Sequence, residues 1–422
     1  MLDNLLYQIK RFIPKSLFNK LAPFYHYSLA FLGALLYFFP SRKLTVIAVT
    51  GTKGKSSTTE MLNAIFEAAG HKTVLLNTIR FKIGEDSQPN KKKMTVPGRF
   101  FLQKMLRSGV NQGCDIAIIE FSSEAAKQYR HKFINLDGLI FTNLKPEHIE
   151  SHGSFENYRE AKLSLAESLR SRTKKRSIIV ANIDDPEGRR FLDSGALVRL
   201  PFSLRDAGLH KIEADGVEFT FRNTKIKSPL RGGFNLMNML GAAVCADAFG
   251  VSVSAIKEGL EKLSIIKGRV EFVKLEQNFD VIIDYAHTAD SLSELYKAFG
   301  SQRKICVLGN TGGGRDKWKR PEMAKVADMY CDVVILTNED PYNENPDEIV
   351  KEMLPGLKKH KPVVIMNRRE AIAEAISRAK GGDAVLITGK GTDPYIMLAD
   401  NQKLPWSDYD VAKEELEKLL RK

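Results

Sequence analysis

The sequence predicts an α/β protein with two successive sheets, each mostly parallel and each covered by helices. Two series of short Val- and Ile-rich runs alternate with segments of helical length, which is typical of buried parallel strands. The length of 422 residues allows two or three domains. We therefore expect a helical N-terminal segment at residues 1–43, a central domain at 44–266 and a C-terminal domain at 267–422.

Each series of apolar runs marks one of the two sheets. The first contains LTVIAV, TVLLN, DIAIIEF, LDGLIFTN and RSIIVAN. The second starts at about Phe279 and contains FDVIIDY, KICVLGN, CDVVILTN, KPVVIMN and DAVLITG. The boundary is predicted near Ile265 to Gly268, after the helix-like segment that ends IKEGLEKLS.

Charge and cysteine content restrict the possible partners. The net charge of +13 and pI near 9.3 favour anionic ligands such as nucleotides, phosphorylated sugars or acidic lipid surfaces. No zinc-finger spacing, RNP-like aromatic motif or dense basic tract is present, so we expect no nucleic acid partner. The cysteines lie far apart, at Cys114, Cys245, Cys306 and Cys331, and are expected to be reduced core residues of a cytoplasmic protein.

The first 43 residues differ from the rest of the chain. They carry six Lys or Arg against the single acid Asp3, and the run from Leu21 to Phe39 has no charged residue. Pro23 and several tyrosines argue against a membrane span. Two interpretations remain: a helix that packs on the next domain, or a peripheral membrane contact through residues 1–41 at the inner face of the membrane.

A phosphate-binding loop (P-loop) follows the first predicted strand. The stretch GTKGKSS supplies Gly51, Thr52, Lys53, Gly54, Lys55, Ser56 and Ser57 between a strand and a helix. Backbone N–H groups and the helix N-terminus would hold phosphates, Lys55 would reach the outer phosphates, and the Ser56 hydroxyl would bind Mg²⁺. We expect a P-loop-containing central domain that binds ATP, followed by a Rossmann-like α/β domain.

Further candidates follow the neighbouring strands. Glu120 is the last residue of the predicted strand DIAIIE. At this position its carboxylate could bind the metal ion of a bound nucleotide. The stretch FTNLKPEHIESHGSFENYREAK then brings together Glu147, His148, His152 and Lys162. A histidine a few residues after a strand, followed by a lysine in a helix, is unusual for a purely structural segment.

From Leu44 to the C-terminus, the ordered motifs resemble those of the Mur ligases, the ATP-dependent amide ligases of cell-wall peptide synthesis. The resemblance is greatest to the muramyl-tripeptide synthetase (MurE) branch, whose loop G-T-x-G-K-[ST] matches GTKGKS. It implies an acceptor carboxylate that is activated as an acyl phosphate and then joined to an amino acid. Typical members begin with a UDP-binding domain of about 100 residues. Because 43 residues precede the core here, we expect that domain to be missing.

The resemblance also implies roles for residues of the central domain. Glu120, His148 and Lys162 would be catalytic and, with Ser56, would hold Mg²⁺, Lys162 as a carbamate. TVPG and EFSSE would place Thr95, Pro97 and Ser122 at the substrate, together with Arg130, while Glu124 replaces a family histidine. GGFNLMNMLGA would bring Asn235 and Asn238 to the nucleotide.

The C-terminal motifs extend the same resemblance. KGRVE and IDYAHTADSL imply nucleotide contacts by Arg269, Asp284 and His287. The family motif D-N-P-R, whose arginine pairs with the distal carboxylate of diaminopimelate, here reads EDPY, and G-K-G-H-E reads GKGTD. We therefore expect substrate contacts by Asp340, Tyr342 and Asp393, and lysine or ornithine as the added amino acid.

Three alternatives remain at this stage. A folylpolyglutamate-synthetase-like ligase shares the chemistry, and assays with folate against muropeptide would separate the two. A P-loop kinase or switch NTPase would turn over ATP without an amine. A non-catalytic partner subunit is disfavoured by the presence of Lys55, Glu120, His148 and Lys162.

Overall fold

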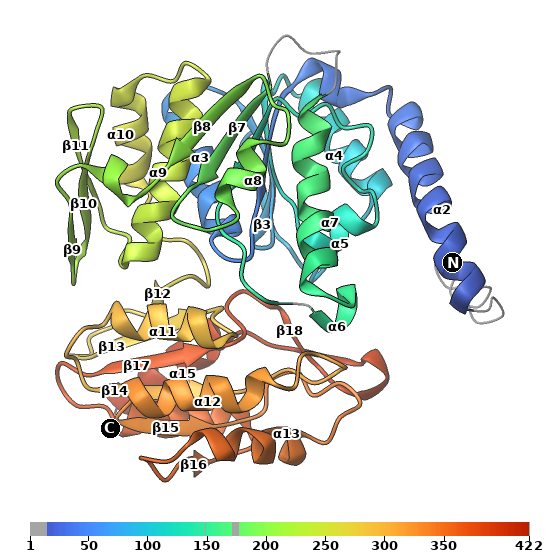
Figure 1. Ribbon diagram of the computed structural model, residues 1–422. Helices are drawn as coiled ribbons and strands as arrows, with labels where there is room; N and C mark the ends of the chain where they lie inside the picture. The colour runs from blue at the N-terminus through green and yellow to red at the C-terminus, as the bar shows by residue number, and fades with distance from the viewer. Residues whose placement is uncertain (1–14, 148, 171–176, 422) are drawn as a thin grey trace.

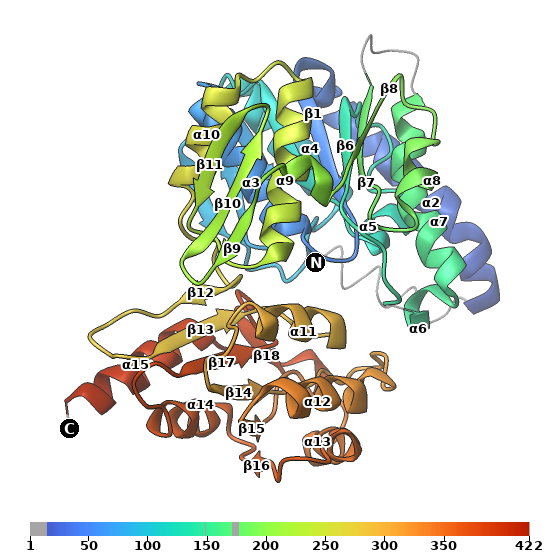
Figure 2. The same cartoon turned by 60° about the vertical axis from the view of Figure 1, so that its left-hand side comes forward.

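The computed structural model describes residues 15–147, 149–170 and 177–421. It contains two α/β units, one above the other in Figures 1 and 2, each built on its own sheet. The eight-stranded sheet ends before α10 (Val253–Lys262), and the six-stranded sheet begins at β12 (Glu271–Phe272). The expected domain boundary falls in the connection between these two elements.

The first sheet has the order β4-β3-β2-β5-β1-β6-β7-β8. Its strands are β1 (Thr45–Thr50), β2 (Thr73–Leu76), β3 (Arg80–Ile83), β4 (Asp86–Pro89), β5 (Ile116–Glu120), β6 (Gly138–Phe141), β7 (Ile178–Asn182) and β8 (Val198–Phe202). Only β3 and β4 pair antiparallel with their neighbours. The central strands are almost completely buried because helices cover both faces, which explains their continuous apolar sequence.

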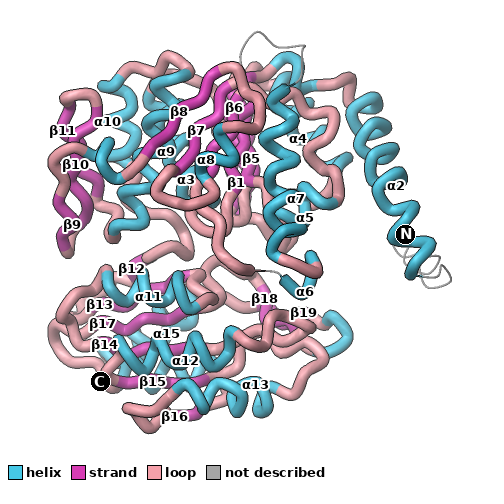
Figure 3. Tube along the Cα trace, in the orientation of Figure 1, coloured by secondary structure: helices cyan, strands magenta, loops and turns pink. Residues whose placement is uncertain are grey.

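Helices form a layer on each face of this sheet, as Figure 3 shows. One layer contains α3 (Lys55–Ala68), α9 (Gly233–Ala248) and α10, and it packs against a small sheet of β9 (Lys211–Glu213), β10 (Gly216–Phe221) and β11 (Thr224–Ser228). The other contains α4 (Arg99–Asn111), α5 (Ser123–Lys127), α7 (Phe155–Glu167) and α8 (Gly188–Leu192). The short α6 (Ile149–His152) precedes α7, and α2 (Lys15–Leu36) runs along the outside of α4 (Figure 1).

The second sheet has the order β12-β13-β17-β14-β15-β16, with only β12 antiparallel. Its other strands are β13 (Asp280–Asp284), β14 (Lys304–Leu308), β15 (Val333–Leu336), β16 (Val363–Val364) and β17 (Ala384–Thr388). One face packs on α11 (Ala289–Lys297), α12 (Lys319–Tyr330) and α13 (Pro346–Met353), the other on α14 (Arg368–Ser377) and α15 (Asp408–Leu420). A hairpin of β18 (Tyr395–Met397) and β19 (Lys403–Pro405) extends from this domain.

Two expectations for the cysteines have different outcomes. Cys114 and Cys245 are buried free thiols, as predicted. Cys306 and Cys331 instead form a disulfide, so the prediction of four reduced cysteines is wrong for this pair. The chain leaves β14, returns through α12 and enters the neighbouring strand β15, and this crossover brings together two cysteines that are 25 residues apart.

Candidate active site

A cavity of about 690 Å³ lies between the two domains and contains most of the predicted site. Its lining includes these predicted residues: Thr52, Lys53, Gly54, Lys55, Ser56, Ser57, Thr95, Glu120, Ser122, Arg130, Asn238, Arg269, Asp284, His287 and Asp393. Gly51, Pro97, Lys162, Asn235, Asp340 and Tyr342 lie outside the lining. His148 lies outside the described residues, so its predicted role stays a prediction.

The P-loop is tightly enclosed between β1 and α3. A Cβ atom on Gly51 would lie 2.0 Å from Thr142 Oγ1, and one on Gly54 would lie 2.2 Å from Asn238 Oδ1. Gly54 also has φ +81° where it precedes α3, a conformation that glycine adopts without strain. The loop therefore needs glycine at both positions, and the backbone it forms opens onto the cleft at the start of a helix.

Lys55 and Ser56 begin α3 and face the cleft. Lys55 Nζ donates to the carbonyl oxygen of Thr52 at 2.8 Å, and burial lowers the pKa of this lysine. Ser56 Oγ donates to Glu120 Oε2 at 2.9 Å, and the same oxygen accepts the Thr78 backbone N–H at 2.9 Å. This end of the cleft thus combines the Lys55 cation, which can bind phosphates, with the adjacent Ser56 hydroxyl and Glu120 carboxylate.

Lys162 on α7 is 2% exposed and lies directly behind the P-loop. Its Nζ donates to the carbonyl oxygen of Gly51 at 2.7 Å and lies 4.8 Å from the ring centre of Tyr158. Burial, reinforced by the positive charge of Lys55, lowers its pKa well below the usual lysine value. A buried lysine with a depressed pKa is neutral for part of the time and can then act as a nucleophilic amine.

The two domains meet at Glu147, which follows β6 in the chain. Its Oε1 accepts a hydrogen bond from Lys53 Nζ at 3.1 Å and lies 3.1 Å from His287 Nε2 of the C-terminal domain. Burial lowers the pKa of His287 to about 4, and nearby Lys53 acts in the same direction. Arg269 makes a second junction, with Nη2 3.5 Å from Ser56 Oγ and the guanidinium 4.4 Å from the Tyr285 ring centre.

The wall expected to hold the nucleotide is partly apolar. Asn238 lines it from α9, whereas Asn235 turns back and donates to the Arg231 carbonyl at 2.8 Å. Phe202, Phe234 and Met237 also line the cleft, and sequence reasoning did not assign them. Phe234 and Met237 belong to the motif GGFNLMNMLGA, so the apolar residues of this motif could have indicated that they line the cleft.

Where the acceptor is expected, the predicted side chains form hydrogen bonds with neighbouring residues. Thr95 Oγ1 lies 3.0 Å from Thr78 Oγ1, and Ser122 caps α5 by accepting the Ala125 N–H. Arg130 donates to Gln128 Oε1 at 2.8 Å and also to the Val96 carbonyl oxygen. Glu124, which replaces the family histidine, lines the cleft and accepts a hydrogen bond from Ser151.

The acids predicted to contact the amino acid are already paired. Asp340 Oδ1 accepts from Lys390 Nζ and from the Met397 N–H, both at 2.8 Å. Lys93 reaches across from the central domain, with Nζ 2.5 Å from Asp340 Oδ2 and 3.3 Å from Asp393 Oδ2. The two acids therefore form a site that holds the ammonium group of Lys93.

Tyr342 and two arginines of the C-terminal domain, Arg315 and Arg368, differ in their position relative to the cleft. The Tyr342 ring lies against Gly313, where a Cβ atom would be 2.8 Å from it. Arg368 is 2% exposed and donates to the Asp408 carboxylate at 2.7 and 2.8 Å, and it does not line the cleft. Arg315 lines the cleft with an exposed side chain and remains available for an anionic group.

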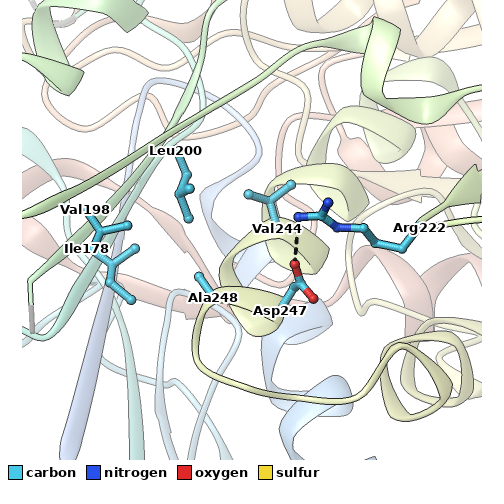
Figure 4. A pocket seen from close by; sticks show the side chains of 7 residues that line it. All are labelled: Ile178, Val198, Leu200, Arg222, Val244, Asp247 and Ala248. Atoms are coloured by element: carbon cyan, nitrogen blue, oxygen red, sulfur yellow. Dashed lines mark hydrogen bonds and ion pairs between the residues drawn. The ribbon is translucent and has the colours of Figure 1, made fainter.

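A second cavity of about 350 Å³ lies away from this site, between β7, β8 and α9 (Figure 4). Ile178, Val198, Leu200, Val244 and Ala248 line it, with an ion pair of 3.1 Å between Arg222 and Asp247 at its edge. It contains none of the predicted site residues, so the interdomain cleft is the candidate active site.

Comparison with known proteins agrees with this geometry. Residues 49–246 match the model of the Mur ligase middle domain, and residues 268–391 match that of the Mur ligase glutamate ligase domain. The chain belongs to the Mur ligase family. Like the family, it is an ATP-dependent, amide-forming ligase, and the α/β fold expected from the sequence is confirmed.

Individual relatives extend over most of the chain. A UDP-N-acetylmuramoyl-L-alanyl-D-glutamate--2,6-diaminopimelate ligase of Clostridium acetobutylicum is 34% identical over 93% of this chain and 82% of its own length. A ligase of the same name from Bacillus velezensis is 36% identical over 94% and 83%.

Two solved structures show how far the Mur ligase fold extends. A solved 2,6-diaminopimelate ligase of this type has a TM-score of 0.61 at 27% identity, covering 89% of this chain and 79% of its own. Mycobacterium tuberculosis folylpolyglutamate synthase has a TM-score of 0.70 at 15% identity, covering 87% and 93%, which shows the shared fold alone.

Proposed function

We propose that this Mur ligase adds an amino acid to a carboxylate of a muropeptide-type acceptor in cell-wall peptide synthesis. The observation that carries the proposal is the convergence of Lys55, Ser56 and Glu120 with Arg269 of the other domain in one cleft. A ligase needs this arrangement because ATP, acceptor and amine must meet in a fixed geometry that excludes water.

The chemistry proceeds in two steps. An acceptor carboxylate oxygen attacks the γ-phosphorus of ATP, and the bond to ADP breaks to leave an acyl phosphate. The amine of the incoming amino acid then attacks the acyl carbon, loses a proton, and the C–O bond to phosphate breaks. Lys55 and Arg269 supply positive charge where phosphate charge develops, and such positioned charges provide much of the acceleration in phosphoryl transfer.

Mg²⁺ fits the oxygen donors beside the P-loop. Ser56 Oγ and Glu120 Oε2 lie 2.9 Å apart at the cleft, and hydroxyl and carboxylate oxygens suit a hard divalent cation. Within the described ranges, His, Cys, Asp and Glu side chains form no group of three or more suited to a metal ion. His148 and a carbamate on Lys162 are proposed as further ligands, together with nucleotide phosphates. When bound, the ion would neutralise phosphate charge.

Lys162 is proposed to carry a carbamate. Its neutral amine would attack CO₂, forming an N–C bond and releasing a proton, which converts a buried cation into an anion with two oxygens. The depressed pKa supports this step because only the unprotonated amine is a nucleophile. The negative charge of the carbamate would help to hold Lys55 and the bound metal ion in position at the P-loop.

The amino acid is proposed to be lysine or ornithine. The names of the relatives point to diaminopimelate, but Tyr342 stands where the resemblance expects an arginine for its distal carboxylate. Asp340 and Asp393 hold the ammonium group of Lys93, and the terminal ammonium of a diamino acid can take its place.

We propose that the acceptor contacts four residues of the central domain: Thr95, Pro97, Ser122 and Arg130.

The test is product formation with purified protein. Release of phosphate from ATP should require both a UDP-linked muropeptide acceptor and an amino acid, and mass spectrometry should show the new amide. Amine-independent ATP turnover would favour a P-loop kinase or switch NTPase, and amide formation with a folate in place of the muropeptide would favour the folylpolyglutamate ligase.

The acceptor is also proposed to be met at a membrane. The enzyme would work in the cytoplasm, at the inner face of the membrane, with residues 1–41 as a peripheral contact. The exposed apolar surface of α2 supports this location.

A further inference from the structure

The helix α2 and the turn after it carry a row of exposed apolar side chains. The apolar ridge consists of Leu21, Phe24, Leu32, Leu35, Leu36 and Phe38, whose side chains are between 49% and 79% exposed. Figure 1 shows α2 at the outer edge of the central domain, beyond α4. Large contiguous apolar patches on an otherwise charged protein usually mark an interaction surface.

The small residues of α2 face the protein, so the ridge is turned outward. Ala30, Gly33 and Ala34 are buried, and a Cβ atom on Gly33 would lie 3.7 Å from backbone atoms at the start of α4. Arg107 of α4 donates to the carbonyl oxygens of Tyr37 and Phe38 at 2.9 and 3.0 Å. The helix is therefore fixed on the domain, and the side chains of the ridge remain exposed.

Charge indicates what covers this ridge. The sequence from Asn4 to Thr59 contains no Asp or Glu, whereas Lys10, Arg11, Lys15, Lys20, Arg42 and Lys43 lie at the two ends of the uncharged run. In the described part of the chain, no helix combines the length and apolar character that crossing a bilayer requires. An apolar face between two basic ends suits a helix that lies in the interface of an anionic membrane.

We propose that the apolar ridge docks the enzyme on anionic lipid bilayers and turns the acceptor end of the cleft toward the membrane. The second part rests on the proposed function. His26 of α2 lies 2.6 Å from Arg99, which also donates to the Gln128 carbonyl oxygen. Gln128 and Arg130 line the acceptor end of the cleft. A helix held at the bilayer is thus connected to the residues proposed to meet a muropeptide.

Vesicle co-sedimentation of the full chain tests the docking. The protein should bind vesicles of phosphatidylglycerol and phosphatidylcholine, and bind pure phosphatidylcholine vesicles more weakly. The variant Phe24→Ser/Leu32→Gln/Leu35→Gln should lower the bound fraction at least about tenfold. A matched control, Leu197→Gln/Leu209→Gln, changes two leucines that are 71% and 89% exposed elsewhere and should bind like the wild type.

Other outcomes overturn the proposal. Failure of the wild type to bind anionic vesicles removes it whether or not the triple variant folds. Concentration-dependent dimerisation that the triple variant abolishes, without vesicle binding, assigns the ridge to a second copy of the chain. Ligase activity with a water-soluble acceptor is measured in parallel and should be unchanged in the triple variant, which separates a failure of docking from a failure of the proposed reaction.

Discussion

Two buried lysines, one in each domain, have opposite electrostatic surroundings. Lys162 is 2% exposed and donates to the backbone carbonyl of Gly51, and burial lowers its pKa well below the usual value. Lys390 is completely buried but lies 2.8 Å from Asp340 and 3.5 Å from Asp393. The two lysines therefore differ in their partners, which are a backbone carbonyl oxygen for Lys162 and two carboxylates for Lys390.

The difference distinguishes a lysine that is suited to a chemical role, Lys162, from one that is suited to a structural role, Lys390. A lysine without a carboxylate partner can lose its proton at moderate cost, so it is suited to covalent or metal-linked chemistry. A lysine between carboxylates pairs with them and holds together the segments that carry them. Here Lys390 connects the loop after β15, which contains Asp340, with the loop after β17, which contains Asp393.

The largest expected effect is on catalysis, in the Lys162→Ala variant. Ligase activity should fall by about 10³-fold because the carbamate proposed for Lys162 cannot form. ATP binding should be retained, since Lys55 and the loop backbone are intact. Steady-state kinetics and nucleotide titration measure the two properties, and bicarbonate should raise the activity of the wild type alone. Turnover of the variant at the wild-type rate would remove the proposed role of Lys162.

The next effect is on stability, in the Lys390→Met variant. Removing this cation leaves Asp340 and Asp393 with Lys93 as their partner, and breaking a buried ion pair of this kind costs about 3 kcal/mol of unfolding free energy. Denaturant unfolding measures the loss. The matched control is Lys162→Met, which leaves no buried carboxylate unpaired and should cost about 1 kcal/mol or less. Equal losses in both variants would mean that the two lysines do not differ as described.

The two domains should also lose stability in different pH ranges. His131 of the central domain is completely buried, neither ring nitrogen has a hydrogen-bond partner, and burial lowers its pKa to about 3. Below pH 6.5 the unfolded chain binds a proton that the folded chain excludes, so stability falls as pH decreases, by about 2 kcal/mol at pH 5. The pKa of Asp340 is lowered by Lys390 and Lys93, against the effect of burial, so its contribution is lost only in stronger acid.

The His131→Phe variant sharpens this comparison. It should flatten the dependence of stability on pH between 5 and 6.5, because the group that the unfolded chain protonates is absent. Urea unfolding of both proteins at pH 7 and pH 5 provides the measurement. A variant that loses as much stability on acidification as the wild type would assign the pH dependence to other groups.

Much of this arrangement could be predicted from local sequence. The runs that became β1, β5 and β14 are continuous and apolar because parallel strands are covered on both faces, and GTKGKS fixes a loop through its own backbone. Contacts between segments that are far apart in the chain could not be predicted from local sequence in this way. Cys306 and Cys331 meet only after a crossover, and Lys93 meets Asp340 across 247 positions. Polar hairpins such as β3 with β4 also lacked the apolar run that marks a buried strand.

The smallest expected effect concerns Lys93, whose side chain is 18% exposed and reaches from one domain to the acids of the other. Its ammonium group lies at the site proposed for the terminal ammonium of lysine or ornithine. The Lys93→Met variant should therefore lower the KM for the preferred diamino acid by about threefold to tenfold, with little change in kcat, because the incoming cation no longer competes with an internal one.

The matched control is the Lys92→Met variant, which changes the neighbouring exposed lysine. Kinetics with lysine, ornithine and meso-diaminopimelate should be compared in all three proteins. A higher kcat/KM for diaminopimelate than for lysine in the wild type would show that the acid pair does not select an ammonium, since the distal carboxylate would then have to be accommodated beside Asp393.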